Sequence, residues 1–223
     1  MNYILPVLAV LGGFLFVSAV RPERHRSLRL LLAFSGAFLL SLTVFSLLPE
    51  LYENGDAAQT GVFIMLGILL QIFLEFFSKG AEHGHVHVHS HNRAFPWVIF
   101  LSLCIHALLE GFPVYGHHTL VYGIVVHKFP IAIILTTFFL RSGMGRGRMF
   151  FFLFLFSLMT PLGTLLAEYL VFLETYDRQI TAVVVGIFLH ISTVILFESS
   201  EGHSFNLSKL LVILMGITVA YFL

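Results

Sequence analysis

Long apolar runs alternate with short polar connectors along this 223-residue chain. Each run holds about 18 to 25 residues, which is enough for a helix to cross the hydrocarbon core of a bilayer. Helices are expected because backbone N–H and C=O groups in lipid must be satisfied within the segment. The predicted segments are eight in number, at about 3–20, 28–49, 59–79, 95–115, 119–140, 148–172, 180–198 and 206–223. The pattern therefore predicts an all-α membrane protein, a bundle of eight transmembrane helices.

Composition agrees with this pattern and indicates no soluble domain. Hydrophobic residues make up 58% of the chain, charged residues make up 11%, and 25 residues are phenylalanine. Such a composition is typical of a chain whose solvent is lipid. The first segment lacks a basic leader, so we expect a permanent span and not a cleaved signal. Residues 1–223 are predicted to form a single transmembrane domain with one polar loop at about 80–93.

Charge is distributed unevenly between the connectors and predicts the orientation. The odd-numbered connectors carry ten basic residues: Arg21, Arg24, Arg26, Arg29, Lys79, Arg93, Arg141, Arg146, Arg148 and Lys209. The even-numbered connectors carry only Arg178, beside five acidic residues. By the positive-inside rule the odd connectors face the cytoplasm, and both termini lie outside. A bacterial cytoplasmic membrane fits the small size and the short loops.

The most informative polar residues lie in the fourth and fifth segments. His106 and Glu110 stand four residues apart, so both side chains share one face of a helix. If the break at Gly116 and His117 is the tip of a hairpin, His106 and His127 are equally far from it. At about 1.5 Å rise per residue, each histidine lies roughly 16 Å deep, near the midplane of a ~30 Å core. The spacing thus predicts His106, Glu110 and His127 at similar depths on neighbouring helices.

Ionisable groups inside a membrane are costly and usually face a cavity or one another. One interpretation of these three residues is an interhelical hydrogen-bond network that only joins the helices. Three such groups at one depth favour a cation site instead. Two imidazoles and one carboxylate suit Zn²⁺ with a water in the remaining position, and they also tolerate Fe²⁺, Mn²⁺, Co²⁺ or Cd²⁺. The ligand set therefore does not name the metal. Zn²⁺ is the favoured cargo, and no prosthetic group is expected.

Histidines also crowd the third connector. His83, His85, His87, His89 and His91 lie within nine residues. Neutral imidazole is a good zinc ligand, so this cytoplasmic loop is predicted to capture metal without an ordered structure of its own. The alternative is a solvated polar loop whose histidines bind nothing specific.

Other polar positions carry weaker signals. His190, midway along the seventh segment, fits either a ligand on the metal pathway or a hydrogen-bonded helix contact. Glu198 and Glu201 fit either acceptors for an exiting cation or an ordinary helix end in water. Glu75, near the cytoplasmic end of the third segment, needs only to extend its carboxylate to the membrane surface.

Two further residues in the segments have both a structural and a chemical interpretation. Thr160 precedes Pro161 in the sixth segment, where a kink for packing and a ligand role are both open. Cys104 is the only cysteine, and we expect a small buried apolar residue rather than a metal ligand.

Several short motifs carry a family resemblance. His-x-x-x-Glu-Gly occurs at His106 to Gly111, and His-Lys-x-Pro occurs at His127 to Pro130. Leu47-Leu48-Pro49-Glu50, Thr160-Pro161-Leu162-Gly163 and the His-rich loop fit the same pattern. On these motifs nearly the whole chain resembles the Zrt-/Irt-like protein (ZIP) family of divalent metal transporters. The resemblance implies metal uptake toward the cytoplasm by alternating access, with the transport site at His106, Glu110 and His127.

Departures from the family pattern predict one transported metal rather than two. Many members have an Asn after the fourth-helix His and acidic residues in the fifth and sixth helices, which build a second metal site. Here those positions hold Ala107, Lys128, Ile131 and Thr160. None of these is a strong ligand, and the Lys128 ammonium would repel a second cation. The His-Lys arrangement resembles that of the subfamily with a single transport metal.

The predicted function is transport of divalent metal cations, with Zn²⁺ favoured, through a single intramembrane site and without enzymatic catalysis. The expected partners are a divalent metal ion and the lipid bilayer, with no nucleic acid; the oligomeric state is open, and a homodimer is one option. The main alternative is an intramembrane zinc-dependent hydrolase with His106, His127 and His190 as ligands and Glu110 as general base. The sequence has no His-Glu-x-x-His motif and no obvious nucleophile, which argues against the hydrolase. A metal sensor without transport would rest on the His-rich loop alone.

Overall fold

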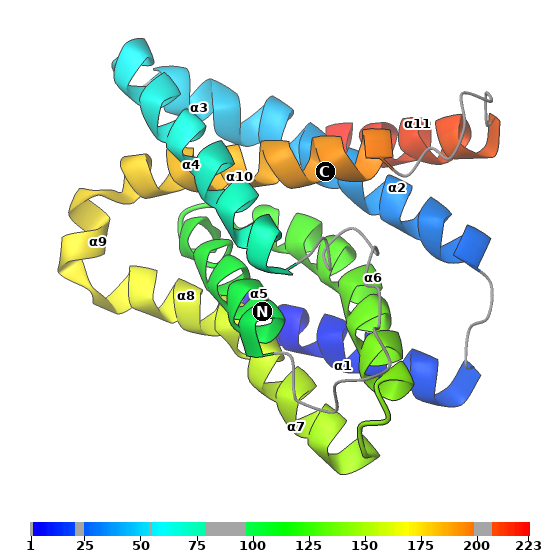
Figure 1. The fold of residues 1–223 in the computed structure, drawn as a ribbon. Helices are drawn as coiled ribbons and strands as arrows, with labels where there is room; N and C mark the ends of the chain where they lie inside the picture. Colours follow the sequence, from blue (N-terminus) through cyan, green and yellow to red (C-terminus); the bar gives the residue numbers. More distant parts are fainter. Residues whose placement is uncertain (1, 21–24, 54, 79–96, 199–206) are drawn as a thin grey trace.

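A computed structural model describes residues 2–20, 25–53, 55–78, 97–198 and 207–223, and these form helices joined by short turns (Figure 1). The longer helices are α1 (Ile4–Val20), α2 (His25–Leu42), α4 (Ala57–Ser78), α5 (Trp97–Leu109), α6 (Leu120–Arg141), α7 (Arg146–Ser157), α8 (Met159–Tyr169), α10 (Asp177–Glu198) and α11 (Leu207–Tyr221). The short elements are the π-helical η1 (Thr43–Leu47), α3 (Leu48–Glu53), the 3-10 turn η3 (Phe112–Val114) and α9 (Val171–Thr175). No strand occurs within the described ranges. The prediction of an all-α chain is confirmed.

Six helical segments in the described part of the chain are long and apolar enough to cross a membrane: Ser27–Glu53, Ala57–Ser78, Trp97–Val114, Leu120–Arg141, Arg146–Tyr169 and Asp177–Phe197. The helices α1 and α11 are apolar as well but shorter. Large apolar side chains also face outward; Phe76, Phe172 and Phe197 are 77%, 70% and 78% exposed. Water-soluble monomers rarely expose so much apolar surface. These features indicate an integral membrane protein.

The helices pack along one another in pairs that are distant in sequence. The helix α4 lies along α10, α1 along α6, and α11 along α2, while α5 contacts both α4 and α8 (Figure 1). The helices α4 and α10 approach closely at Gly67 and Gly186. A methyl group at either glycine would overlap a backbone carbonyl of the other helix, at Val183 or Ile64. The two backbones therefore touch, as is common between helices in membranes.

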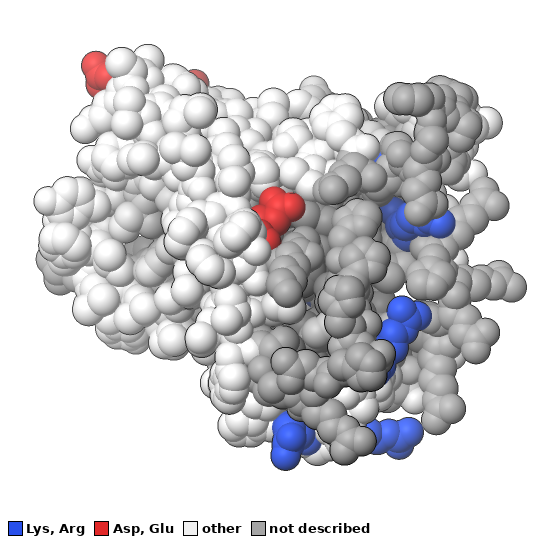
Figure 2. All heavy atoms as spheres, viewed as in Figure 1, with Lys and Arg blue, Asp and Glu red and all other residues white. Residues whose placement is uncertain are grey.

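Charged residues separate between the two ends of the bundle. One end holds the beginning of α2 and the junction of α6 with α7, and Figure 2 shows Lys and Arg side chains in this region of the visible face. Arg29, Arg141, Arg146 and Arg148 belong to these elements. The other end holds α3, α9 and the start of α10, with the acidic residues Glu50, Glu53, Asp56, Glu174 and Asp177. The fold thus gathers the charges that the sequence distributes among alternate connectors.

Two prolines explain irregularities that the sequence analysis did not predict. The predicted sixth segment, 148–172, is divided at Leu158 into α7 and α8. Pro161 has no N–H to donate to the carbonyl three to four residues earlier, so the regular ladder is interrupted there. The predicted second segment contains η1, in which the N–H of Leu48 bonds to the carbonyl of Thr43, five residues back. Pro49 follows directly, and its missing N–H disturbs the ladder in the same way.

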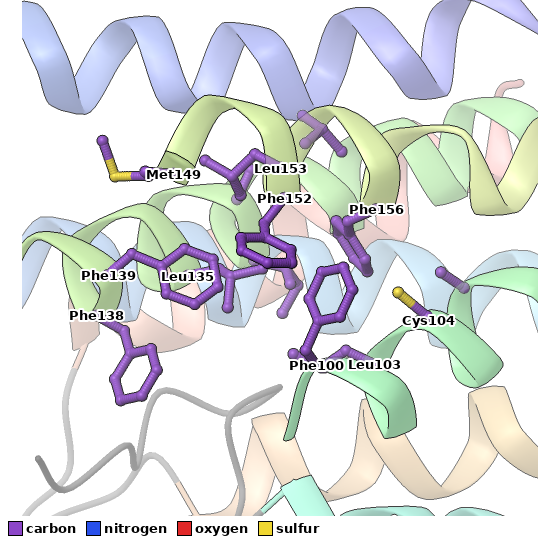
Figure 3. Packing of buried hydrophobic residues seen from close by; sticks show 14 residues of the cluster. Phe100, Leu103, Cys104, Leu135, Phe138, Phe139, Met149, Phe152, Leu153 and Phe156 are labelled. Carbon is purple, nitrogen blue, oxygen red and sulfur yellow. The ribbon is translucent and has the colours of Figure 1, made fainter. Parts of the chain in front are cut away.

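An apolar cluster packs α5 and α6 against α7 (Figure 3). Its labelled members are Phe100, Leu103, Cys104, Leu135, Phe138, Phe139, Met149, Phe152, Leu153 and Phe156. Cys104 lies within this cluster and is only 9% exposed. Its surroundings agree with the interpretation as a small apolar residue.

The residues before α1 are tied to the acidic end of the bundle. The Tyr3 hydroxyl donates a hydrogen bond to the Glu168 carboxylate of α8, and Asn2 Nδ2 lies 2.7 Å from His118 Nδ1. The hydrogen bond to Glu168 raises the pKa of Tyr3 to about 12. The start of α1 is thus held beside α8 by the hydrogen bond from Tyr3 to Glu168.

Candidate metal centre

The end of α5 presents His106 and Glu110 to the centre of the bundle. His106 lies in the last turn of α5, and the N–H of Glu110 bonds to its carbonyl at 3.0 Å. The next N–H, that of Gly111, bonds to Leu108 at 3.1 Å, so the helix tightens there into a 3-10 turn. The predicted spacing of one turn between His106 and Glu110 is thus present in the backbone, although Glu110 lies just beyond the α-helix itself.

The structure brings the three predicted ligands to one place. His106 Nε2 lies 3.5 Å from Glu110 Oε2, and the His106 and His127 ring centroids are 6.3 Å apart with the planes inclined by 79°. His106, Glu110 and His127 are 4%, 1% and 2% exposed. Because water is excluded, their polar atoms must be satisfied by one another, by neighbouring protein groups or by a bound ion.

Lys128 neutralises the carboxylate at the centre of this group. Its Nζ lies 2.5 Å from Glu110 Oε1 and 4.6 Å from the centre of the Phe156 ring. Lys128 follows His127 directly, so its Cα lies about 100° farther round α6. The long lysine side chain nevertheless reaches across to Glu110, and the ring of Phe156 adds a favourable cation–π contact. The ion pair is buried, with side-chain exposures of 2% and 1%.

Thr160 supports the same carboxylate from α8. Its Oγ1 lies 2.7 Å from Glu110 Oε1 and 2.9 Å from the Ala107 carbonyl oxygen. The helix breaks before Thr160-Pro161, which agrees with the interpretation as a kink, and the hydroxyl forms a hydrogen bond to the Glu110 carboxylate. Thr164, one turn later, donates to the Gly111 carbonyl at 2.9 Å. The end of α5 is thus fastened to α8 by two threonine hydroxyls.

Glycines make this approach possible. A methyl group at Gly111 would overlap the Thr160 carbonyl oxygen, and one at Gly163 would overlap the Leu108 carbonyl oxygen. With any larger residue the two backbones would separate, and the Thr160 hydroxyl would be withdrawn from Glu110. The two glycines therefore allow the end of α5 and the start of α8 to lie in close contact.

The arrangement combines a cation-binding ligand set with a competing ammonium. Two imidazoles and a carboxylate are suitable ligands for zinc and similar ions. Within the described ranges, however, no three His, Cys, Asp or Glu side chains are arranged so that they could hold a metal ion. In this form the counter-charge of Glu110 is the Lys128 ammonium. Glu110 Oε2 already faces His106, whereas Oε1 would have to separate from the Lys128 ammonium for the whole carboxylate to bind a cation.

His190 lies in a separate polar contact between α10 and α4. Its Nε2 is 2.6 Å from Glu75 Oε2, and the two side chains are 15% and 24% exposed. This agrees with the interpretation of His190 as a hydrogen-bonded helix contact. Glu75 does more than extend to the membrane surface, because it joins the two helices one turn beyond Gly186.

Several predicted metal ligands fall outside the described residues. These are His83, His85, His87, His89, His91 and Glu201. Glu198 is the last residue of α10, and its side chain is not among those described.

Sequence reasoning missed the hydrogen bond from Thr160 to Glu110 and the pairing of Glu75 with His190. Each joins residues more than forty positions apart, and neither spacing is visible in the sequence. The available signal was the presence of a hydroxyl or a carboxylate within an apolar segment, which already requires a partner.

The chain matches no protein-family model, and the comparison with curated proteins found no match. Its function is therefore inferred from its own residues and their geometry.

Proposed function

We propose that the chain is a divalent metal transporter of the kind found in the ZIP family, with Zn²⁺ as the favoured cargo. Eight helices span the membrane, the six long ones together with α1 and α11, and both termini lie outside. The metal moves toward the cytoplasm, in a bacterial cytoplasmic membrane, through a single site formed by His106, Glu110 and His127. The protein is a carrier that exposes this site alternately to each side, and no catalysis is involved.

One observation carries the proposal. Two histidines and a glutamate, all less than 5% exposed, come together from two helices of an apolar bundle. Ionisable groups are costly in such a place, and a role in ion passage is the usual reason for their presence. The contact is also incomplete, since Glu110 is shared with Lys128 and Thr160. A transported ion must leave again, so a partly satisfied ligand set suits transport better than a closed structural site.

Lys128 gives this site a second state. When no metal is bound, the ammonium compensates the charge of Glu110 at 2.5 Å. A divalent ion entering beside His106 competes with the ammonium for the same carboxylate. When the ion leaves, Lys128 returns to Glu110, so that the carboxylate is never buried without a counter-charge. The same positive charge opposes the binding of a second metal ion.

The orientation follows from the charges at the two ends of the bundle. The basic end, where α2 begins and α6 meets α7, faces the cytoplasm by the positive-inside rule. The His-rich loop at about 80–93 then lies on the cytoplasmic side, where its imidazoles receive or sense the transported ion. Deleting it should alter the rate of metal release without abolishing transport.

Transport of radiolabelled Zn²⁺ into proteoliposomes tests the proposal directly. We expect His106→Ala, Glu110→Ala and His127→Ala each to lower the flux roughly a hundredfold or more, because each removes one of three ligands. His118→Ala and Glu53→Ala are matched controls, since both residues are exposed at the end of the bundle. The controls should retain the flux of the unmodified protein.

Two outcomes would contradict the proposal. Normal flux in any one of the three variants, at equal amounts of monodisperse protein, would place the transport site elsewhere. Hydrolysis of added lipid or peptide without any flux would favour the hydrolase alternative.

A further inference from the structure

A second group of metal-ligating side chains lies at the acidic end of the bundle, around a cavity of about 110 Å³. The cavity is lined by Leu47, Glu50, Leu51, His117, Asp177, Arg178 and Thr181. These residues come from η1 and α3, from the turn before α6, and from the first turns of α10. The cavity is therefore formed where three separate parts of the chain meet, and it has room for several water molecules.

The polar lining is dominated by groups that attract cations. Glu50 and Asp177 supply two carboxylates, and His117 Nδ1 lies 3.2 Å from Glu50 Oε2. Arg178 is the single basic residue of the lining, and its guanidinium lies directly against Gly55 in the connection between α3 and α4. With a neutral imidazole, these side chains carry a net charge of −1, from two carboxylates and one guanidinium.

Thr181 adds an independent indication of a ligand. It is 3% exposed and lines the cavity, yet its Oγ1 has no hydrogen-bond partner among the described residues. A buried hydroxyl without a partner is unfavourable, and each such group requires an explanation. A polar guest in the cavity, such as a water molecule that belongs to a hydrated ion, would provide the missing partner.

We propose that this cavity binds a hydrated divalent cation. Among the described residues no three His, Cys, Asp or Glu side chains are arranged so that they could hold a bare metal ion. The cavity instead has room for an ion that keeps water ligands, and carboxylates, imidazole and hydroxyl bind such an ion through those waters. Glu50 is 56% exposed and His117 only 17%, so the carboxylate meets the ion from solution first.

The position of the cavity relative to the candidate metal centre suggests that the cavity supplies ions to that centre. His117 precedes α6, and His127 lies in the same helix about 10 Å from its start at ~1.5 Å per residue. If the chain transports metal as proposed above, the cavity concentrates hydrated ions at the outer end, and the dehydrating ligands lie further inside. Only this use rests on the proposed function; the binding of the ion does not.

Binding is tested with Mn²⁺, counted by electron paramagnetic resonance on the purified full-length chain, in which His106→Ala removes a ligand of the inner site and alanine replaces the five histidines of the 80–93 loop. We expect one weak site that hexaamminecobalt(III) displaces, because this complex resembles a hydrated ion and cannot exchange its ligands. Glu50→Gln and Asp177→Asn should each weaken Mn²⁺ binding roughly fivefold, the effect of one carboxylate near the ion in water. Glu53→Gln, an exposed glutamate outside the cavity, is the matched control and should bind as the parent does.

The same experiment can overturn the proposal. Undiminished Mn²⁺ binding in both cavity variants would show that the cavity is not the site, as would resistance of the bound ion to hexaamminecobalt(III). Thr181→Val provides a second measurement if a carboxylate variant does not fold, and it too should weaken binding. Flux measurements separate this proposal from the transport proposal. Glu50→Gln in the cavity should raise the KM for the transported metal and leave kcat unchanged. Loss of the inner site, as in His127→Ala, should abolish flux and leave Mn²⁺ binding in the cavity intact.

Discussion

Lys128 places a positive charge inside the helix bundle, where its partner is the Glu110 carboxylate at 2.5 Å. Both side chains are almost fully buried, so neither charge is compensated by water. Removal of one member of a buried pair typically destabilises a protein by about 3–5 kcal/mol, since the other charge is left alone. Lys128 therefore contributes to stability as well as to the chemistry of the site.

We expect Lys128→Met to lower the thermal stability of the detergent-solubilised protein. Glu110→Gln in the same chain should restore most of the loss, because no charge then remains buried alone. Added Zn²⁺ should stabilise Lys128→Met more than the unmodified protein, because the ion no longer competes with an ammonium for Glu110. Unfolding temperatures with and without Zn²⁺ provide the measurement. An equal Zn²⁺ effect in both proteins would mean that Lys128 does not compete with the metal.

At the scale of elements, the end of α5 and the start of α8 form one unit. Gly111 and Gly163 allow backbone contact, and Thr160 and Thr164 each donate to a carbonyl of the opposite element. The candidate metal centre therefore depends on a contact between two backbones and not only on its ligands.

Gly111→Ala should disrupt the centre without altering any ligand. The added methyl group would overlap the Thr160 carbonyl oxygen, and we expect a destabilisation of about 1–3 kcal/mol together with reduced flux. Gly116→Ala is the matched control, because a methyl group there meets nothing within 4 Å. Thermal unfolding and flux are measured on both variants. A stable Gly111→Ala protein with full flux would show that the close approach is not required.

The helices were largely predictable from the sequence, whereas their interruptions were not. Apolar runs of membrane length must be helical, so seven of the predicted segments lie close to the observed helices. The break at Leu158 and the π-turn η1 were missed. A proline in the sequence shows that one backbone N–H is missing from the helix. Whether the helix then bends, widens or ends depends on the packing around the proline.

The contacts of the candidate metal centre were likewise only partly predictable from the sequence. His106 and Glu110 were predictable neighbours, because four residues make one helical turn. The approach of His127 was inferred from matched depth alone. The bonds of Glu110 to Lys128 and Thr160 depend on tertiary packing between α5, α6 and α8, which no local spacing encodes.

At the scale of the whole molecule, the separation of basic and acidic ends predicts how the bundle lies in the membrane. Cysteine labelling tests this in a Cys104→Ala background. Gly116→Cys and Gly145→Cys introduce exposed thiols at opposite ends, and each new side chain meets nothing within 4 Å. A membrane-impermeant maleimide added to intact cells should label Gly116→Cys, and it should label Gly145→Cys only after permeabilisation.

The opposite labelling pattern would mean that the acidic end faces the cytoplasm, which contradicts the proposed orientation. Labelling of both positions in intact cells would contradict a membrane orientation of the bundle as a whole. A third label at the C-terminal Leu223 should share the accessibility of Gly116→Cys if α11 spans the membrane.

The orientation of α3 about its axis depends on the number of residues in the π-turn at Thr43–Leu47. A bond that spans five residues instead of four accommodates one residue more than a regular turn, and each residue corresponds to about 100° of rotation. Deletion of one residue here, such as Phe45, would restore an ordinary helix and turn α3 by that angle relative to α2. Glu50 would then no longer face His117, although both residues would still be present. A single insertion or deletion in this segment would therefore change the geometry of the cavity lined by Glu50 and His117. A sequence alignment that scores only residue identity would not reveal this change.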